Sequence, residues 1–174
     1  MNLTKILSIT FIISLSFQTH SAADTPHYLD FKYILNQSDA GKKAQNYLKK
    51  KLNDGIKKIK DKEKGIQEEE KKIIQQKKVI AAEEYKKKVT ALRSKVSALQ
   101  KERNTLLDSV AKQRSKARNE LLKNLNPIIK EYMKTNKIRV VLDKKSLLLA
   151  DENLDITKQI LASLNKQLKS IKLN

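Results

Sequence analysis

The sequence predicts an α+β fold that is mostly α, in which a small body with short strands carries a long antiparallel pair of helices. Residues 42–124 contain no proline, and the 174-residue chain has only three glycines and two prolines, too few for a large β-domain. Apolar residues recur along this stretch in steps of three and four, the heptad pattern of paired helices. Short β-type runs lie near the two ends of the chain.

Residues 1–23 are expected to be a cleaved secretory signal peptide. Lys5 precedes an apolar run at residues 6–17, and small residues follow at 21–23, as at signal peptidase sites. A retained membrane anchor is the alternative. However, the twelve apolar residues are fewer than the ~20 that a helix needs to span a bilayer.

The chain is strongly cationic, with 38 Lys and Arg against 19 Asp and Glu and a net charge of +19. Only five of the basic residues are arginine, so most of the charge consists of single ammonium groups, which do not bind phosphate in bidentate fashion. A coding bias toward lysine would give the same excess. Composition alone therefore does not decide whether the charge is used in binding.

The chemistry-bearing residue types are scarce. Cysteine is absent and the two histidines are His20 and His27, so disulfides, thiolate zinc sites, multi-histidine metal sites and Ser-His-Asp triads are not expected. Gly41 and two following lysines resemble part of a phosphate-binding loop, but that motif needs Gly at 36 and Ser or Thr at 43, where this chain has Asn36 and Lys43. No enzyme activity, metal or cofactor is expected.

The N-terminal elements are short. Residues 27–31 alternate in the manner of a strand, and residues 32–35 allow one helical turn. Ser38 is a suitable helix N-cap, and Asp39 lies where the helix dipole favours a negative charge.

Residues 42–124 form the expected arm, which holds +15 of the charge. Charged residues interrupt the stripe in its first half at Glu63, Glu70 and Lys77. We expect the chain to fold back near residues 79–83, although a single unbroken helix that dimerises remains the alternative. Gly55 and Gly65 each weaken a helix by about 1 kcal/mol relative to Ala, so a bendable arm is predicted. The apolar stripe of the second half consists of Tyr85, Val89, Leu92, Val96 and Leu99.

The C-terminal part is expected to be compact. Pro127 predicts a kink or a restart of the helix, and residues 128–134 continue as helix up to a cap at Asn136. Residues 138–142 and 147–149 predict an antiparallel β-hairpin joined by residues 143–146. A last helix is expected from Asp155 as N-cap, with Ile156, Ile160, Leu164 and Leu168 on its buried side.

Three short strands make too small a sheet to be stable without a covered face. Their edges are also open to pairing with another chain. A symmetric oligomer that joins the sheets of several chains would meet both needs, but these arguments do not set the number of subunits.

Two segments of the chain resemble the Skp/OmpH-like periplasmic chaperone family. The first is YLDFKYILNQSDAGKKAQNYLKKKL (residues 28–52), in which a strand ending in Asp leads through a small-residue turn into a long helix. The second is VVLDKKSLLLADENLDIT (residues 140–157), which matches the hairpin and the start of the last helix. Leu149 departs from the pattern, because many relatives have an aromatic residue there.

The resemblance implies a homotrimer in which strands of three chains form a small β-barrel body (residues 24–41 and 127–174) and three helical arms (42–126) surround a cavity. It implies ATP-independent holding of unfolded outer-membrane proteins in the periplasm. The residues expected in the trimer body are Tyr28, Leu29, Phe31, Ile138, Val140, Leu142, Leu147 and Leu149.

Two sets of arm residues are candidates for contact with an unfolded client protein. Apolar side chains of the arm could touch the client, unless they only fill the core between its helices. They are Ile66, Ile73, Val79, Ile80, Val89 and Val96. Lysines near the expected turn could attract acidic clients, anionic lipid or lipopolysaccharide, or could only keep the arm soluble. They are Lys71, Lys72, Lys77, Lys78, Lys86, Lys87 and Lys88.

Two other functions fit parts of the sequence. A coiled-coil spacer of the cell envelope, without chaperone activity, would explain the arm but not the strands. A nucleic-acid-binding protein would explain the charge, but it conflicts with export and with the shortage of arginine and aromatic residues in the arm.

Overall fold

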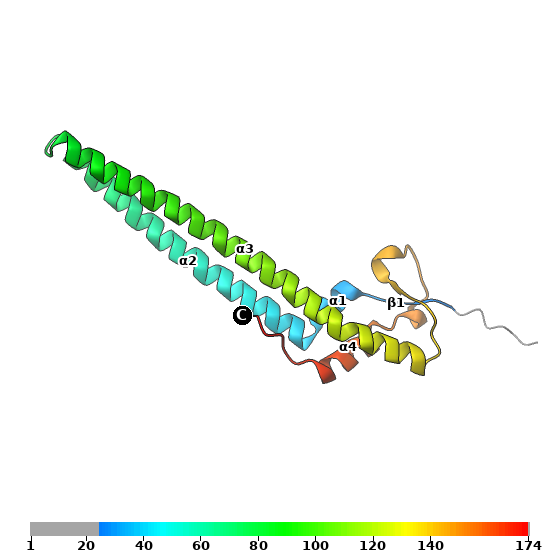
Figure 1. The fold of residues 1–174 in the computed structure, drawn as a ribbon. Helices are drawn as coiled ribbons and strands as arrows, with labels where there is room; N and C mark the ends of the chain where they lie inside the picture. Colours follow the sequence, from blue (N-terminus) through cyan, green and yellow to red (C-terminus); the bar gives the residue numbers. More distant parts are fainter. Residues whose placement is uncertain (1–24, 174) are drawn as a thin grey trace, which may run out of the picture.

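The computed structural model describes residues 25–173, so the predicted signal peptide lies outside the described residues. Figure 1 shows a small body at one end of the molecule and a long two-helix arm that projects from it. In chain order, the elements are β1 (His27–Leu29), α1 (Phe31–Gln37), α2 (Asp39–Gln76), α3 (Ala82–Thr135), β2 (Val141–Asp143), the 3-10 turns η1 (Lys144–Ser146) and η2 (Glu152–Leu154), and α4 (Thr157–Gln167).

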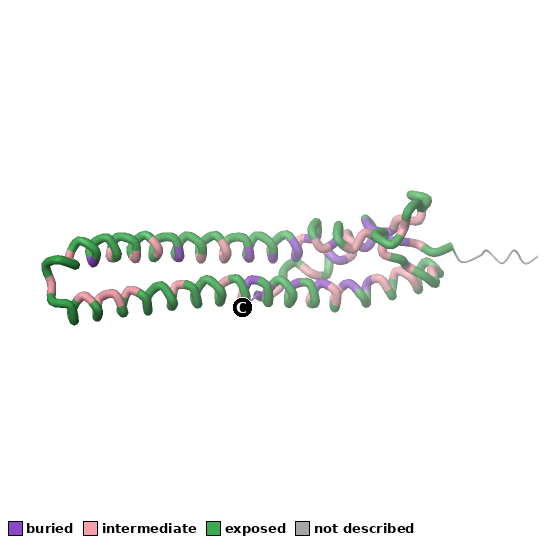
Figure 2. The backbone as a smooth tube through the Cα atoms, turned by 90° about the horizontal axis from the view of Figure 1, so that it is seen from above, coloured by how far each residue is buried: buried purple, intermediate pink, exposed green. Residues whose placement is uncertain are grey.

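The arm consists of α2 and α3, which run antiparallel beside each other (Figures 1 and 2). This confirms the predicted helical hairpin over the single unbroken helix. The turn occupies residues 77–81, slightly before the predicted position, and Glu83 lies in the first turn of α3. The backbone N–H groups of Val79 and Ile80 both donate to the carbonyl of Gln76, at 2.9 and 3.1 Å, which closes the turn without Gly or Pro.

Asp30 ends the first strand earlier than expected. Its carboxylate accepts a hydrogen bond from the backbone N–H of Tyr33 at 2.7 Å, which makes Asp30 the N-cap of α1. Phe31, predicted as the end of the strand, is therefore the first residue of a helix. The predicted single helical turn is a seven-residue helix.

The junction between α1 and α2 forms as the sequence predicts. Ser38 is the N-cap of α2, and its hydroxyl accepts from the backbone N–H of Gly41 at 3.1 Å. Asp39 lies in the first turn. A Cβ atom on Gly41 would overlap the carbonyl oxygen of Leu35, so only glycine allows α1 and α2 to approach this closely.

Of the two outcomes predicted at Pro127, a kink or a restart of the helix, the restart is wrong, because α3 continues through this residue to Thr135. Proline removes one backbone donor and disturbs a single turn. Its neighbours Leu125 and Ile128 are buried in the body core, at 1% and 5% exposure. Their packing is the stronger influence, since helices in proteins owe most of their stability to a buried face.

The end of α3 is a Schellman motif. Asn136 is the C-cap, as predicted, and Lys137 follows in a left-handed conformation with φ of 57°. The backbone N–H of Ile138 donates to the carbonyl of Met133 at 2.8 Å, and that of Lys137 to Lys134 at 3.3 Å. This turn sends the chain back toward β1.

The predicted antiparallel β-hairpin is wrong. β2 pairs in parallel with β1, with Tyr28 opposite Leu142, and residues 147–149 form no strand. The cause is Asp143, whose side chain accepts from the backbone N–H of Lys145 at 3.2 Å. This bond caps η1 and turns the chain away directly after β2.

The body core joins the two ends of the chain. α4 begins at Thr157, with Ile156 as N-cap and the predicted cap Asp155 one position earlier, where its side chain accepts from the backbone N–H of Thr157. The core lies between α1, the body end of α3 and α4. Its buried residues are Leu29, Ile34, Ala40, Leu121, Leu125, Ile128, Ile156, Ile160 and Leu164, and the predicted Leu168 packs against them.

No helix in residues 25–173 is both long enough and apolar enough to cross a membrane.

Candidate functional site

Fewer residues of the arm are buried toward its tip (Figure 2). In α3, the buried residues begin at Val110, and residues 82–109 contain none. In the distal half of α2, only Ile59 and Ile73 are buried. Few buried apolar contacts mean low local stability, so the tip is the part of the arm that opens most easily.

Ion pairs between the two helices replace part of the missing apolar seam. Lys95 Nζ lies 2.6 Å from Glu69 Oε2, and Arg103 lies 3.6 Å from Glu63. A third pair joins Lys62 to Glu102 at 2.5 Å. All these side chains are partly exposed, so each pair contributes at most about 1 kcal/mol. Glu63 is one of the charged residues that interrupt the predicted stripe, and Arg103 compensates it.

A groove of about 370 Å³ lies between α2 and α3 near the tip. We call it the tip groove. It brings together four of the six predicted apolar contact residues from both helices. It is lined by Ile66, Glu70, Ile73, Ile74, Tyr85, Val89, Leu92, Arg93 and Val96.

Residues of the tip groove differ in what they can contact. Ile73 is 5% exposed and belongs to the seam, whereas Ile74 is 60% and Val96 is 51% exposed. Ile66 and Val89 are half-buried. The groove therefore presents apolar surface to solvent. Ile74 was not among the predicted contact residues, although its position directly after the seam residue Ile73 places an apolar side chain beside the seam.

The other two predicted apolar residues lie in the turn, outside the groove. Val79 is 81% exposed, and Ile80 is half-buried.

The predicted lysines surround the tip. Six of the seven are exposed and form no ion pair with any residue that the structure describes: Lys71, Lys72, Lys77, Lys78, Lys86 and Lys87. Lys88 differs, because its Nζ lies 2.7 Å from Gln76 Oε1 and 3.4 Å from Glu84 Oε1. Lys88 therefore helps to close the turn, whereas the six free ammonium groups project a positive field.

The predicted body residues fall into two groups. Tyr28 and Leu29 are buried within this single chain, and Phe31, Ile138 and Leu147 are half-buried. In contrast, Val140, Leu142 and Leu149 are exposed, at 43%, 38% and 95%. Leu148, which was not predicted, is fully exposed. The signal for it was the run of three leucines at residues 147–149.

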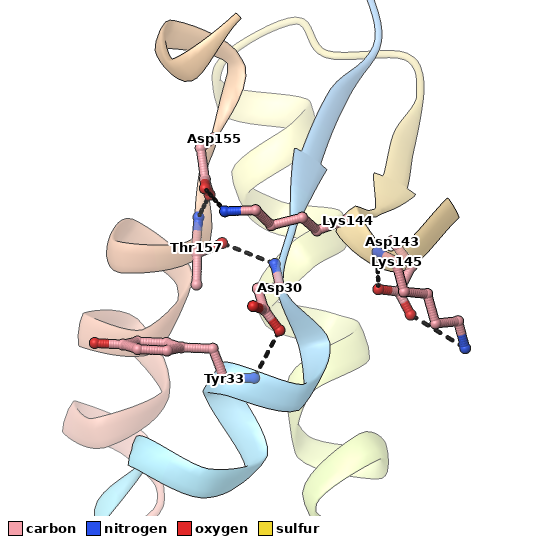
Figure 3. A network of polar contacts seen from close by, with 7 residues as sticks. All are labelled: Asp30, Tyr33, Asp143, Lys144, Lys145, Asp155 and Thr157. Carbon is pink, nitrogen blue, oxygen red and sulfur yellow. Dashed lines mark hydrogen bonds and ion pairs between the residues drawn. The ribbon is translucent and has the colours of Figure 1, made fainter. Parts of the chain in front are cut away.

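A polar network joins β1 to the start of α4 (Figure 3). The backbone N–H of Asp30 donates to Thr157 Oγ1 at 2.8 Å, and Lys144 lies 3.6 Å from Asp155. Burial alone would raise the pKa of Asp155, but hydrogen bonds from Thr157 and the charge of Lys144 outweigh it and lower the pKa. These groups satisfy one another, which indicates a structural role.

No group of three or more His, Cys, Asp or Glu side chains that could hold a metal ion occurs in the described part of the chain.

Comparison with known proteins shows to which family a chain of this architecture belongs. A family model described as Outer membrane protein (OmpH-like) matches residues 27–164. The chain belongs to the OmpH-like family. This confirms the resemblance found in the two end segments. No curated protein sequence matches this OmpH-like chain.

A crystal structure from Caulobacter crescentus CB15, described as a candidate outer membrane chaperone (OmpH-like), has a TM-score of 0.80 to this OmpH-like chain. The match covers 92% of this chain and 96% of the other, at 22% sequence identity. At this identity, the likeness establishes a shared fold.

Proposed function

We propose that this protein is an ATP-independent holding chaperone of the periplasm, which binds unfolded outer-membrane proteins and prevents their aggregation in transit. The observation that carries the proposal is the tip groove, an open apolar surface among unpaired lysines on an OmpH-like arm. Export, predicted from residues 1–23, supports the location.

The shape of the tip groove suits holding and release. An unfolded barrel strand exposes apolar side chains at alternate positions, and a chaperone must cover them without binding too tightly to release them. The groove offers half-buried side chains such as Val89 and half-exposed ones such as Val96. Burial of apolar surface stabilises a complex by about 25 cal/mol per Å². Each contact buries little area and is therefore weak, so affinity comes from many such contacts.

The six free tip lysines supply long-range attraction. Acidic clients, anionic lipid and lipopolysaccharide phosphates would all be drawn toward the tip, over a screening length of about 8–10 Å at physiological salt. Such a field raises the rate of encounter more than the final affinity.

The body supports assembly into a homotrimer with a joint β-barrel. Among the described residues, β2 pairs only with β1, so its other edge is open to a strand of another chain. Leu148 and Leu149 are 101% and 95% exposed close to this edge in sequence. Covering them in a trimer would remove apolar surface from water and set three arms around one cavity.

Dilution of a urea-unfolded outer-membrane barrel protein into buffer tests the proposal. With the purified protein present, turbidity should stay low without ATP, and native mass spectrometry should find three copies with one client. If turbidity rises as much with the protein as without it, this result would contradict the chaperone function and would favour the envelope spacer.

A further inference from the structure

The last residues of the chain run back along the arm. Figure 1 shows the segment after α4 turning toward α2, so that its described end lies beside that helix. We call residues 168–173 the tail. Its end is buried, because Leu173 is 8% exposed and packs in a small cluster with Ala44, Leu48 and Ala117. We call these three residues the root slot.

The tail has the pattern of an extended strand. Ile171 is half-buried and packs against the root slot cluster and the body core, Lys172 is exposed, and Leu173 is buried. Apolar residues at alternate positions point to one side of an extended chain. An unfolded barrel strand presents its side chains with the same period.

Few interactions hold the tail in place. The backbone N–H of Leu168 donates to the carbonyl of Leu164 at 2.8 Å. Beyond it, no backbone hydrogen bond joins the tail to any other described residue. An exposed ion pair, Lys169 to Asp39 at 3.4 Å, adds little. Beyond Leu168, which packs against the body core, two apolar side chains therefore provide most of the attachment.

The root slot adjoins a larger groove, in which leucines and alanines lie beside polar and basic side chains such as Arg114 and Arg118. Ala44 and Ala117 are small residues on facing helices, so they leave room for an inserted side chain. The same three slot residues also line a second groove of about 610 Å³ that stays open with the tail in place. Leu35, Leu52 and Leu121 extend this groove. A chain longer than the tail would thus find further apolar surface here.

We propose that the root slot is a second client-binding site, which accepts an extended segment with apolar side chains at alternate positions and which the tail occupies in cis until a client displaces it. The identity of the displacing client rests on the proposed function. The exchange between tail and slot is independent of it.

A tail bound in cis lowers the apparent affinity of the slot. The apparent dissociation constant equals the intrinsic one divided by the fraction of open slots, so a tail docked in about nine of ten molecules weakens binding about tenfold. Releasing the tail should therefore increase the apparent affinity of the slot by the same factor.

The variant for the test is the full chain with Ile171→Ser and Leu173→Ser, which removes both anchors. Lys172→Ser is the matched control, because this exposed residue lies between the two anchors. The probe is a fluorescein-labelled peptide of residues 166–174, KQLKSIKLN, which contains the tail, and binding is followed by fluorescence anisotropy. The double variant should bind this peptide several-fold more tightly than wild type or the control. A peptide with serine at both anchor positions should not bind.

Equal binding of the peptide to all three proteins, or to none, would overturn the proposal. Circular dichroism tests whether the double variant folds. Should it unfold, Leu173→Ala removes less side chain, and the same ranking with a smaller difference is expected.

A second measurement concerns the client. The double variant should bind a urea-unfolded barrel protein more tightly than wild type does, and the tail peptide should compete for part of that binding. If no variant binds the barrel protein, the chaperone function fails, but the peptide result still decides whether the slot exchanges its tail. Client affinity that ignores both the substitutions and the peptide would overturn the slot as a client site.

Discussion

Thr157 Oγ1 accepts a hydrogen bond from the backbone N–H of Asp30 at 2.8 Å, although the two residues are 127 positions apart (Figure 3). A second bond, from the N–H of Ile156 to the carbonyl of Tyr28 at 2.9 Å, lies beside it. The acceptor Thr157 is 6% exposed, and losing the bond would leave the partly buried N–H of Asp30 without this partner. These two hydrogen bonds thus join the residues around β1 to the start of α4. The arm projects from the body that they help to hold together.

Gly41 and Gly65 should respond in opposite ways to alanine. A Cβ at position 41 would overlap the Leu35 carbonyl, whereas at position 65 it meets nothing within 4 Å. Gly41→Ala should cost about 1–3 kcal/mol through overpacking, and Gly65→Ala should add up to about 1 kcal/mol from helix propensity. Urea unfolding followed by circular dichroism measures both. The same sign for both variants would contradict the close approach of α1 and α2.

Asp155 should make stability depend on pH in acid. Its pKa in the folded protein lies below the ordinary value of 3.8, so the unfolded state takes up the proton first. The stabilisation is present above that value and is lost as the pH falls through the folded pKa. Asp155→Asn should therefore flatten the loss of stability in acid, measured by urea unfolding between neutral pH and the acid limit.

The control for that experiment is Asp54→Asn. Asp54 is exposed on the arm, with no hydrogen bond or ion pair to any described side chain. It should leave the pH profile unchanged. Identical profiles for Asp155→Asn and wild type would show that Asp155 is not stabilised as described.

Replacing the six free tip lysines by glutamine should slow client capture and flatten its dependence on salt, because the long-range attraction is removed. Stopped-flow fluorescence at several salt concentrations measures the capture rate. A control with the same charge change replaces six exposed, unpaired lysines of the arm nearer the body: Lys42, Lys43, Lys57, Lys58, Lys60 and Lys64. Equal effects of both sets would mean that only net charge matters.

The tip groove can be tested through its exposed residues. Ile74→Ser and Val96→Ser should each weaken client binding several-fold, since about 1 kcal/mol of lost apolar contact corresponds to a factor of about 5. Both side chains are at least half exposed, so the fold should persist. Leu107→Ser is the matched control, because Leu107 is 52% exposed but lies outside the groove. Titration of unfolded client by fluorescence anisotropy would reject the groove if all three variants bind alike.

Leu148→Ser combined with Leu149→Ser should shift the proposed trimer toward monomer. Both side chains are fully exposed in the single chain, so the variant should keep its circular dichroism. Analytical ultracentrifugation over a range of protein concentrations measures the change. Val79→Ser, also at an exposed apolar residue but at the far end of the arm, should not alter the assembly. A trimer that survives the double substitution would place the interface elsewhere.

Much of the site was predictable because helical contacts follow sequence spacing. The heptad pattern placed Ile66, Ile73, Val89 and Val96 on facing helices, and they line one groove. Which of them stay exposed depends on how closely the two helices approach. Burial of Ile73 and exposure of Val96 could not be separated by spacing alone. The tail was missed because its docking site, the root slot, lies more than fifty residues away along the chain.

The sequence by itself determined the hairpin of helices, the caps at Ser38 and Asn136, the cationic tip and the membership of a family. All of these features depend on residues that are neighbours along the chain or one helical turn apart. Only the tertiary structure decided that β2 pairs in parallel with β1, that α3 passes through Pro127 and that Leu173 reaches the arm. Strand pairing and core packing join distant residues, and their combined free energy outweighs the local preference of a proline or of a four-residue turn.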